Sequence, residues 1–73
     1  MLGWNTAWRR QEQIVKIIRE AIAEHGEGPT LGEIVERAGL GSIGSVHYHL
    51  TQLEKKGVIV REPWQPRSIR LTC

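Results

Sequence analysis

Apolar positions recur every three or four residues between Trp8 and His25, which predicts an amphipathic helix over this stretch. Asn5 or Thr6 is expected to cap its start, because either side chain can accept hydrogen bonds from the first backbone N–H groups. Gly26 is expected to end it. The apolar stripe that should face the core consists of Ile14, Ile17, Ile18, Ala21 and Ile22.

A second, shorter helix is predicted from Leu31 to Ala38. Thr30 and Glu33 stand in the order typical of a capping box, in which the two side chains and the two backbone N–H groups bond reciprocally. Gly39 follows the last helical position and is expected to end the helix. The expected element is therefore about two turns long.

A third helix is predicted over residues 43–56, because Val46, Leu50 and Leu53 recur at helical spacing on one face. Ser42 is placed to cap its start, and a pair of lysines followed by Gly57 marks its end. With the apolar face buried, the side chains left on the outer face are mostly hydrogen-bonding types. They are Gly44, Ser45, His47, Tyr48, Thr51 and Lys55.

Two alternating runs of β-branched residues, Val58–Glu62 and Ser68–Thr72, predict a hairpin whose tip is the proline-containing segment 63–67. Three apolar residues of the hairpin are expected to face the core: Ile59, Ile69 and Leu71. Three arginines are left for solvent or phosphate: Arg61, Arg67 and Arg70.

Three helices followed by a two-stranded β-hairpin predict an α+β fold, a winged helix-turn-helix, in a single domain over residues 1–73. In such a fold the third helix, residues 43–56, fits the major groove of double-stranded DNA by width. The hairpin, residues 58–72, would form a wing on the DNA backbone. The pattern therefore favours a DNA-binding module.

Charge is divided unevenly along the chain, although the net charge is only +2. Residues 1–40 carry five basic and six acidic side chains, whereas residues 41–73 carry five basic and two acidic ones. The basic excess thus coincides with the third helix and the hairpin, which is the distribution expected of a face that binds a polyanion.

Composition narrows the possible functions further. Cys73 is the only cysteine, so no disulfide framework or cysteine–histidine metal set is expected, and no cofactor or small-molecule substrate is predicted. No apolar run approaches the roughly 20 residues of a membrane span, and no signal peptide is visible, so a cytoplasmic location is expected. The glutamates lack an accompanying nucleophile, and we predict that the chain is not an enzyme.

The stretch from Arg10 to Leu71 resembles the N-terminal DNA-binding domain of LexA-type repressors, without insertion or deletion. The matching landmarks are Arg10-Gln11, Gly26, Pro29-Thr30, Glu33-Ile34, Ser45-Val46-His47, His49-Leu50, Leu53 to Ile59, and Arg67. The motif Ser45-Val46-His47 resembles the Gram-positive and actinobacterial branch of the family. The resemblance implies a bacterial, nucleoid-associated repressor of the SOS-response type that recognises a palindromic operator, with a homodimer possible on DNA.

Residue roles follow from the same resemblance. The base-facing positions would be Gly44, Ser45, His47 and Tyr48. The resemblance places Arg10, Ser42, Lys56 and Arg67 near the DNA backbone. The hairpin pattern adds three further candidates for backbone contact: Arg61, Trp64 and Arg70. These roles agree with chemistry, because serine and histidine can hydrogen-bond base edges while arginine and lysine neutralise phosphates.

Several of these residues also admit a plainer interpretation. Ser42 can either bond phosphate or only cap its helix, and His47 can be a solvated surface histidine. Tyr48 can touch DNA or pack against the wing, while His49 is expected to be structural. Trp64 can pack on a neighbouring strand, stack on sugar or enter the minor groove, or meet another protein.

The chain departs from the LexA pattern in three ways. Ile43 and Gly44 stand where the family often has proline and a polar residue, so the operator could differ. Ala7-Trp8 replaces the usual Leu-Thr start of the first helix. Nothing after Thr72 could encode the self-cleaving second domain of such repressors.

Two alternative functions stay open: a winged helix that contacts protein, and a binder of left-handed nucleic acid or RNA.

Overall fold

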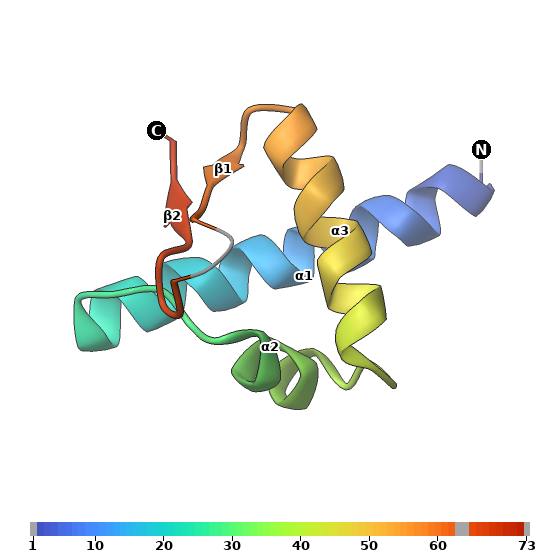
Figure 1. Ribbon diagram of the computed structural model, residues 1–73. Helices are drawn as coiled ribbons and strands as arrows, with labels where there is room; N and C mark the ends of the chain where they lie inside the picture. Colours follow the sequence, from blue (N-terminus) through green and yellow to red (C-terminus); the bar gives the residue numbers. More distant parts are fainter. Residues whose placement is uncertain (1, 63–64, 73) are drawn as a thin grey trace.

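The computed structural model describes residues 2–62 and 65–72, which form three helices and a two-stranded antiparallel sheet (Figure 1). This arrangement confirms the predicted winged helix-turn-helix fold. In chain order the elements are α1 Leu2–His25, α2 Leu31–Ala38, α3 Ile43–Lys55, β1 Ile59–Val60 and β2 Arg70–Leu71.

Helix α1 starts earlier than predicted, at Leu2, so the expected cap at Asn5 or Thr6 is wrong. Asparagine and threonine favour cap positions because their side chains compete for backbone hydrogen bonds, yet both are tolerated inside a helix. No proline or glycine stands between Trp4 and His25 to interrupt the helix. The additional turns extend α1 beyond the rest of the molecule (Figure 1).

The predicted caps of α2 and α3 are confirmed. The Thr30 Oγ1 atom accepts a hydrogen bond from the Glu33 N–H (3.1 Å), and a Glu33 carboxylate oxygen accepts one from the Thr30 N–H (3.0 Å). Gly39, at φ 67°, ends α2 in the left-handed conformation that glycine adopts most readily. The Ser42 Oγ atom accepts a hydrogen bond from the Ser45 N–H at 3.3 Å.

The hairpin has much shorter strands than predicted: the antiparallel ladder pairs Ile59 with Leu71 and Val60 with Arg70. Beyond it, the Ser68 hydroxyl takes the place of backbone pairing. Its oxygen accepts a hydrogen bond from the Glu62 N–H (2.9 Å) and donates one to the Glu62 carbonyl (3.0 Å). Side-chain bonding of this kind competes with a regular ladder, which explains why the strands end early.

One hydrophobic core joins all three helices and the hairpin. Its buried members are Ile14, Ile17, Ile18, Ile34, Ala38, Val46, Leu50, Leu53, Ile59 and Ile69. The predicted core positions Ile59 and Ile69 are confirmed, whereas Leu71 is only half-buried at the edge of the cluster. Burial of the α3 stripe fixes which face of that helix turns outward.

The connector between α1 and α2 passes very close to the hairpin. A Cβ atom placed on Gly28 would overlap the backbone carbonyl oxygen of Ile69, and would also lie 3.3 Å from the Ile69 Cβ. Gly28 and Pro29 are both buried at this contact. The absence of a side chain at Gly28 therefore allows the hairpin to sit against the helical body.

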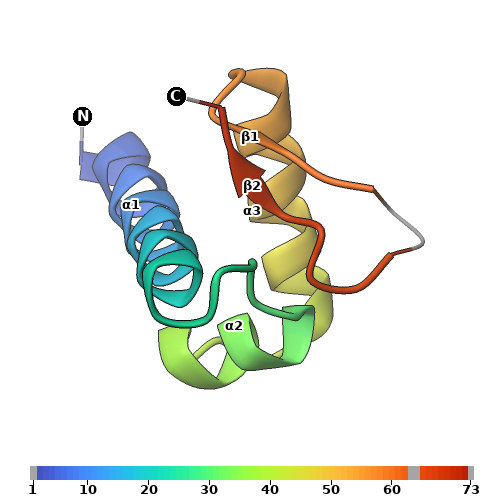
Figure 2. The same ribbon diagram turned by 90° about the vertical axis from the view of Figure 1, so that its left-hand side faces the viewer.

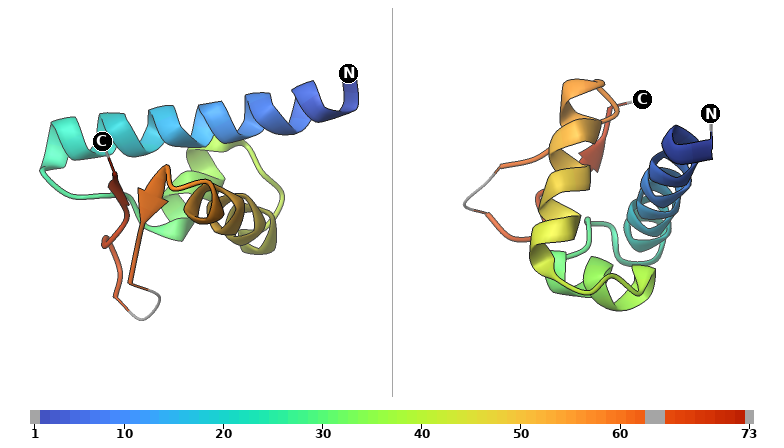
Figure 3. Two further views of the ribbon diagram at one scale, coloured as in Figure 1. Left: turned by 90° about the horizontal axis from the view of Figure 1, so that it is seen from above. Right: turned by 90° about the vertical axis from the view of Figure 1, so that its right-hand side faces the viewer.

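Figures 2 and 3 show how the elements are arranged around α3. Helix α1 lies on one side of α3, and the described hairpin residues after β1 and before β2 lie on the other side. The outward face of α3 and the hairpin therefore share a side of the molecule that α1 does not cover.

Candidate nucleic-acid interface

The outward face of α3 carries the four residues predicted to read bases. Gly44, Ser45, His47 and Tyr48 are all exposed, because the buried stripe of Val46, Leu50 and Leu53 turns them away from the core. Tyr48 is a large aromatic residue with 60% of its surface exposed. This part of α3 is free to meet a partner, as the spacing predicts.

Ser42 and Ser45 lie together at the start of α3. The Ser42 Oγ atom accepts from the Ser45 N–H, and the two hydroxyl oxygens are 3.4 Å apart. Ser42 therefore caps the helix, which was one of its two predicted roles. Both residues remain exposed, so their hydroxyl groups stay accessible.

Tyr48 packs edge-on against His49, with ring centroids 5.4 Å apart and an interplanar angle of 70°. His49 leans inward as predicted and is half-buried. Burial lowers the pKa of His49, and the charge of Arg10 lowers it further. Within the described part of the chain, the buried Nδ1 atom of His49 has no hydrogen-bond partner. The inward position and the ring contact indicate a structural role for His49 beside the Tyr48 ring.

Arg61 joins the hairpin to the outward face of α3. Its Nε atom donates to a Glu54 carboxylate oxygen at 3.1 Å. Its Nη2 atom lies 3.0 Å from the Nδ1 atom of His47 and 3.4 Å from the Oγ1 atom of Thr51. Only 10% of the Arg61 side chain is exposed. Arg61 is therefore not left for solvent, because α3 offers it three partners, whereas its contact with phosphate stays a prediction.

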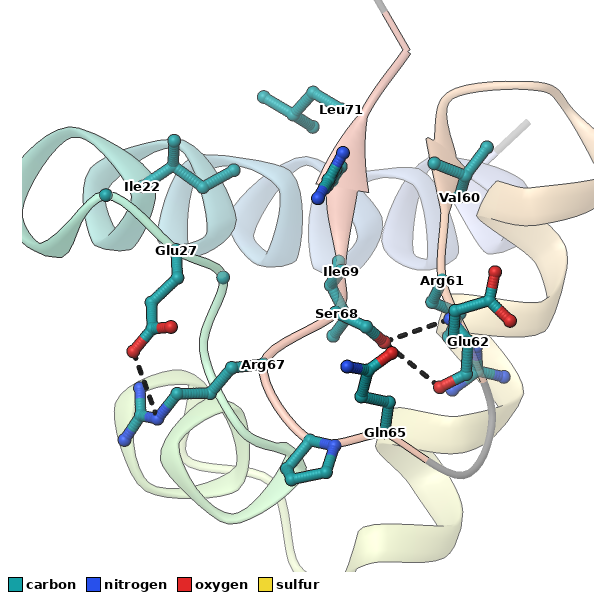
Figure 4. Close-up of a pocket in the computed structure, with 14 residues that line it drawn as sticks. Ile22, Glu27, Val60, Arg61, Glu62, Gln65, Arg67, Ser68, Ile69 and Leu71 are labelled. Atoms are coloured by element: carbon teal, nitrogen blue, oxygen red, sulfur yellow. Dashed lines mark hydrogen bonds and ion pairs between the residues drawn. The ribbon is translucent and has the colours of Figure 1, made fainter.

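Arg67 is also paired rather than free, and it ties the hairpin to the start of α2. Its Nη1 and Nη2 atoms donate to the two carboxylate oxygens of Glu33 at 3.2 and 2.8 Å. Its Nε atom lies 3.7 Å from a Glu27 carboxylate oxygen, and Figure 4 shows the side chain pointing from the hairpin toward Glu27. Arg67 itself adopts a left-handed backbone conformation, with φ 59°.

This pairing shifts the pKa values of both partners. The hydrogen bond from Arg67 and the backbone hydrogen bond of Thr30 hold the pKa of Glu33 below its usual range. The same hydrogen bond to Glu33 raises the pKa of Arg67. The carboxylate of the α2 capping box is thus also the anchor of the hairpin.

The remaining predicted backbone contacts are spread over different elements. Arg70 is exposed on β2, opposite Val60. The Lys56 Nζ atom, at the end of α3, donates to the Gln11 Oε1 atom at 2.7 Å. The Arg10 Nη1 atom donates to the Ala38 carbonyl at 3.0 Å, which satisfies an acceptor at the end of α2. Trp64 lies outside the described residues.

Sequence reasoning missed the acidic partners Glu33 and Glu54, as well as the exposed Ile43, which stands at the first position of α3 with 52% exposure. Glu54 precedes Arg61 by seven residues in different elements, so no short motif connects them. Thr51 follows His47 by one helical turn, and this spacing does place both on the same face. Its hydroxyl donates to the His47 carbonyl at 2.9 Å.

The site as a whole offers hydrogen-bonding and apolar groups on α3, flanked by cationic side chains of the hairpin. This combination suits recognition of base edges beside phosphates. Among the residues described, no group of three histidine, cysteine or acidic residues could hold a metal ion. No described helix is both long and apolar enough to cross a membrane.

Comparison with known proteins agrees with this geometry. Residues 6–68 match the family model described as the LexA DNA binding domain. The chain is 48% identical over 63 residues to the LexA repressor of Caldicellulosiruptor saccharolyticus, which covers 86% of this chain and 31% of that repressor. It is 47% identical over 62 residues to the LexA repressor of Brevibacillus brevis, covering 85% of this chain and 30% of that protein. The matched region thus spans about 30% of the length of these relatives.

Proposed function

Because the chain belongs to the LexA DNA-binding domain family, we propose that it binds double-stranded DNA sequence-specifically and acts as a transcriptional repressor. In this proposal residues 1–73 act as one domain in the bacterial cytoplasm, at the nucleoid. Helix α3 enters the major groove, and the hairpin lies on the backbone as a wing. The observation that carries the proposal is the polar outer face of α3, which shares its side of the molecule with the arginine-bearing hairpin (Figures 2 and 3).

The proposed base contacts are those of Gly44, Ser45, His47 and Tyr48. The hydrogen-bonding side chains of Ser45 and His47 suit base edges, and the lack of a side chain at Gly44 lets the helix approach closely. The exposed Ile43 adds a group that fits a thymine methyl. This contact would give the exposed, apolar Ile43 side chain a role in reading the DNA sequence.

The proposed backbone contacts are those of Arg10, Ser42, Lys56, Arg61, Trp64, Arg67 and Arg70. Arg61 and Arg67 are held by carboxylates in the free protein. A phosphate would therefore have to displace these carboxylates before it could pair with either guanidinium group. Arg70 is exposed on β2 and needs no rearrangement of this kind.

A palindromic operator and a homodimer on DNA are also part of the proposal. A single domain of this size has limited contact area, and two half-sites multiply the affinity of a weak module. The relatives are named repressors, and the match to their DNA-binding region favours this function over a protein-contact module or a binder of left-handed nucleic acid or RNA. The prediction that the chain is not an enzyme agrees with its membership of a family defined by DNA binding.

The test is selection of duplexes from a random library, followed by fluorescence anisotropy on selected and scrambled sequences at several salt concentrations. Selected half-sites should be palindromic, and affinity should fall with a log–log slope of roughly −0.9 for each phosphate neutralised. Ser45→Ala should relax the sequence preference, whereas Lys56→Ala should weaken all duplexes alike. Arg19→Ala removes an equal charge from the exposed side of α1 and serves as the control. Equal affinity for selected and scrambled duplexes at moderate salt would refute the proposal.

A further inference from the structure

The contact between Arg61 and His47 determines which ring nitrogen of His47 carries the proton. The guanidinium group of arginine carries only hydrogen-bond donors and stays charged in proteins. Its Nη2 atom lies 3.0 Å from the Nδ1 atom of His47. At this distance the contact is favourable only when Nδ1 accepts, since a proton on Nδ1 would set two donors against each other. The neutral imidazole ring must then carry its proton on Nε2.

Arg61 is held firmly enough to impose this state. Its Nε atom donates to Glu54 at 3.1 Å, and its Nη2 atom also meets the Thr51 hydroxyl at 3.4 Å. That hydroxyl donates its own proton to the His47 carbonyl at 2.9 Å, which leaves its oxygen free to accept from Arg61. With 10% of the Arg61 side chain exposed, water competes weakly for the guanidinium. One arginine thus connects three residues on a single face of α3.

From this geometry we infer that Arg61 is a specificity-determining residue: it fixes His47 as an Nε2–H donor, so that His47 selects a hydrogen-bond acceptor on the base that it meets. In the major groove the acceptors are purine N7, guanine O6 and thymine O4, whereas the amino group of cytosine is a donor. Arg61 acts through His47 and is in this respect a positioning residue. The inference rests on the proposed function for its DNA step, but the tautomer of His47 belongs to the free protein.

The first measurement is the tautomer itself, by long-range proton–nitrogen correlation NMR of the protein with 15N-labelled histidine. At pH 8, well above the ordinary histidine pKa, His47 of the wild-type chain should show the Nε2–H form. Arg61→Met keeps an unbranched apolar stem but has no donor, so the ring should become a mixture of both tautomers. Arg70→Met removes the same charge from the exposed position on β2 and should leave His47 unchanged.

The second measurement is base preference. The base position contacted by His47 is identified as the one at which His47→Ala loses discrimination in duplex selection. There, Arg61→Met should reduce discrimination against cytosine by about fivefold, toward the lower end of what one good base contact contributes. Arg70→Met should weaken binding to every duplex and leave this preference intact. If Arg61→Met does not fold, Glu54→Gln provides a milder change: it replaces the ion pair with a weaker, neutral hydrogen bond, loosens the hold on the guanidinium and should shift both readouts in the same direction.

Two outcomes would overturn the inference directly, and a third would do so in part by refuting the proposed function. A wild-type His47 protonated on Nδ1 would contradict the tautomer assignment without any reference to DNA. Retention of the Nε2–H form and of the base preference in both Arg61→Met and Glu54→Gln would show that Arg61 does not control either. A wild-type protein with the Nε2–H ring but no preference among duplexes would instead refute the proposed function, and the specificity role of Arg61 with it, while the tautomer assignment would stand.

Discussion

Replacing Gly28 with alanine tests whether the hairpin depends on a close backbone approach. The new Cβ would overlap the carbonyl oxygen of Ile69 and lie 3.1 Å from its carbonyl carbon. Both groups belong to backbone, so neither can move aside as the end of a flexible side chain would. The hairpin must therefore shift relative to the connector between α1 and α2.

The expected cost follows from the size of this overlap. Overpacking a close-packed site costs about 1–3 kcal/mol, and a backbone clash belongs toward the upper end of that range. A domain of this length has a total unfolding free energy of roughly 4–11 kcal/mol. With a urea dependence of about 1 kcal/mol/M, Gly28→Ala should lower the midpoint of urea unfolding by about 1–3 M.

Gly32→Ala is the matched control, because it makes the same chemical change four residues along the chain. Gly32 lies in α2 and is exposed, and an added Cβ would lie 4.0 Å from the Thr30 Oγ1 atom, which is an ordinary van der Waals contact. Alanine favours helix over glycine, so this variant should be more stable than wild type by up to about 1 kcal/mol. The two variants should thus change stability in opposite directions in circular-dichroism urea titrations. A Gly28→Ala midpoint at or above that of wild type would refute the reasoning.

Three further predictions concern the core, a cap and an ion pair. Leu50→Ala should reduce the unfolding free energy by about 2–5 kcal/mol, because Leu50 is fully buried; a smaller loss in urea titration would mean that the cavity collapses. Ser42→Ala should lower the unfolding free energy by about 1 kcal/mol through loss of the α3 cap, whereas Ser42→Asp should keep most of the stability that the cap provides. Equal losses of stability in the two variants would contradict this. The lowered pKa of Glu33 means that its contribution to stability is present above the ordinary glutamate pKa of roughly 4.3 and is lost as the pH falls through the lowered value. Urea titrations between pH 7 and pH 2.5 should therefore show a steeper acid loss for wild type than for Glu33→Gln, and parallel curves would exclude the effect.

The helical part of the fold could be predicted from the sequence because its signals are local. The capping box of Thr30 and Glu33 and the stripe of Val46, Leu50 and Leu53 each lie within one helix, where propensity and burial agree. The start of α1 could not be predicted, because a good cap residue is also tolerated inside a helix when nothing stops the chain before it.

The hairpin arginines show where sequence reasoning stops. The sequence predicts that Arg61, on an alternating strand, and Arg67, at the hairpin tip, are left for solvent or phosphate. Their partners, Glu54 and Glu33, lie 7 and 34 residues away in other elements, and only the folded arrangement brings the charges together. The predicted DNA contacts of these residues stay predictions until a complex is measured.

The ion pairs of the hairpin have a consequence for how a repressor would search a genome. An operator competes with an enormous number of unrelated sites, and a protein loses time on them in proportion to its affinity for any phosphate backbone. Arg61 and Arg67 already hold carboxylates, so an arbitrary stretch of DNA must displace a partner before it gains either cation. Only a duplex that also forms the base contacts of α3 compensates for the loss of these ion pairs. Under the proposed function, three glutamates would therefore shorten the time that the protein stays bound to unrelated DNA, although they do not touch DNA themselves. They are Glu27, Glu33 and Glu54.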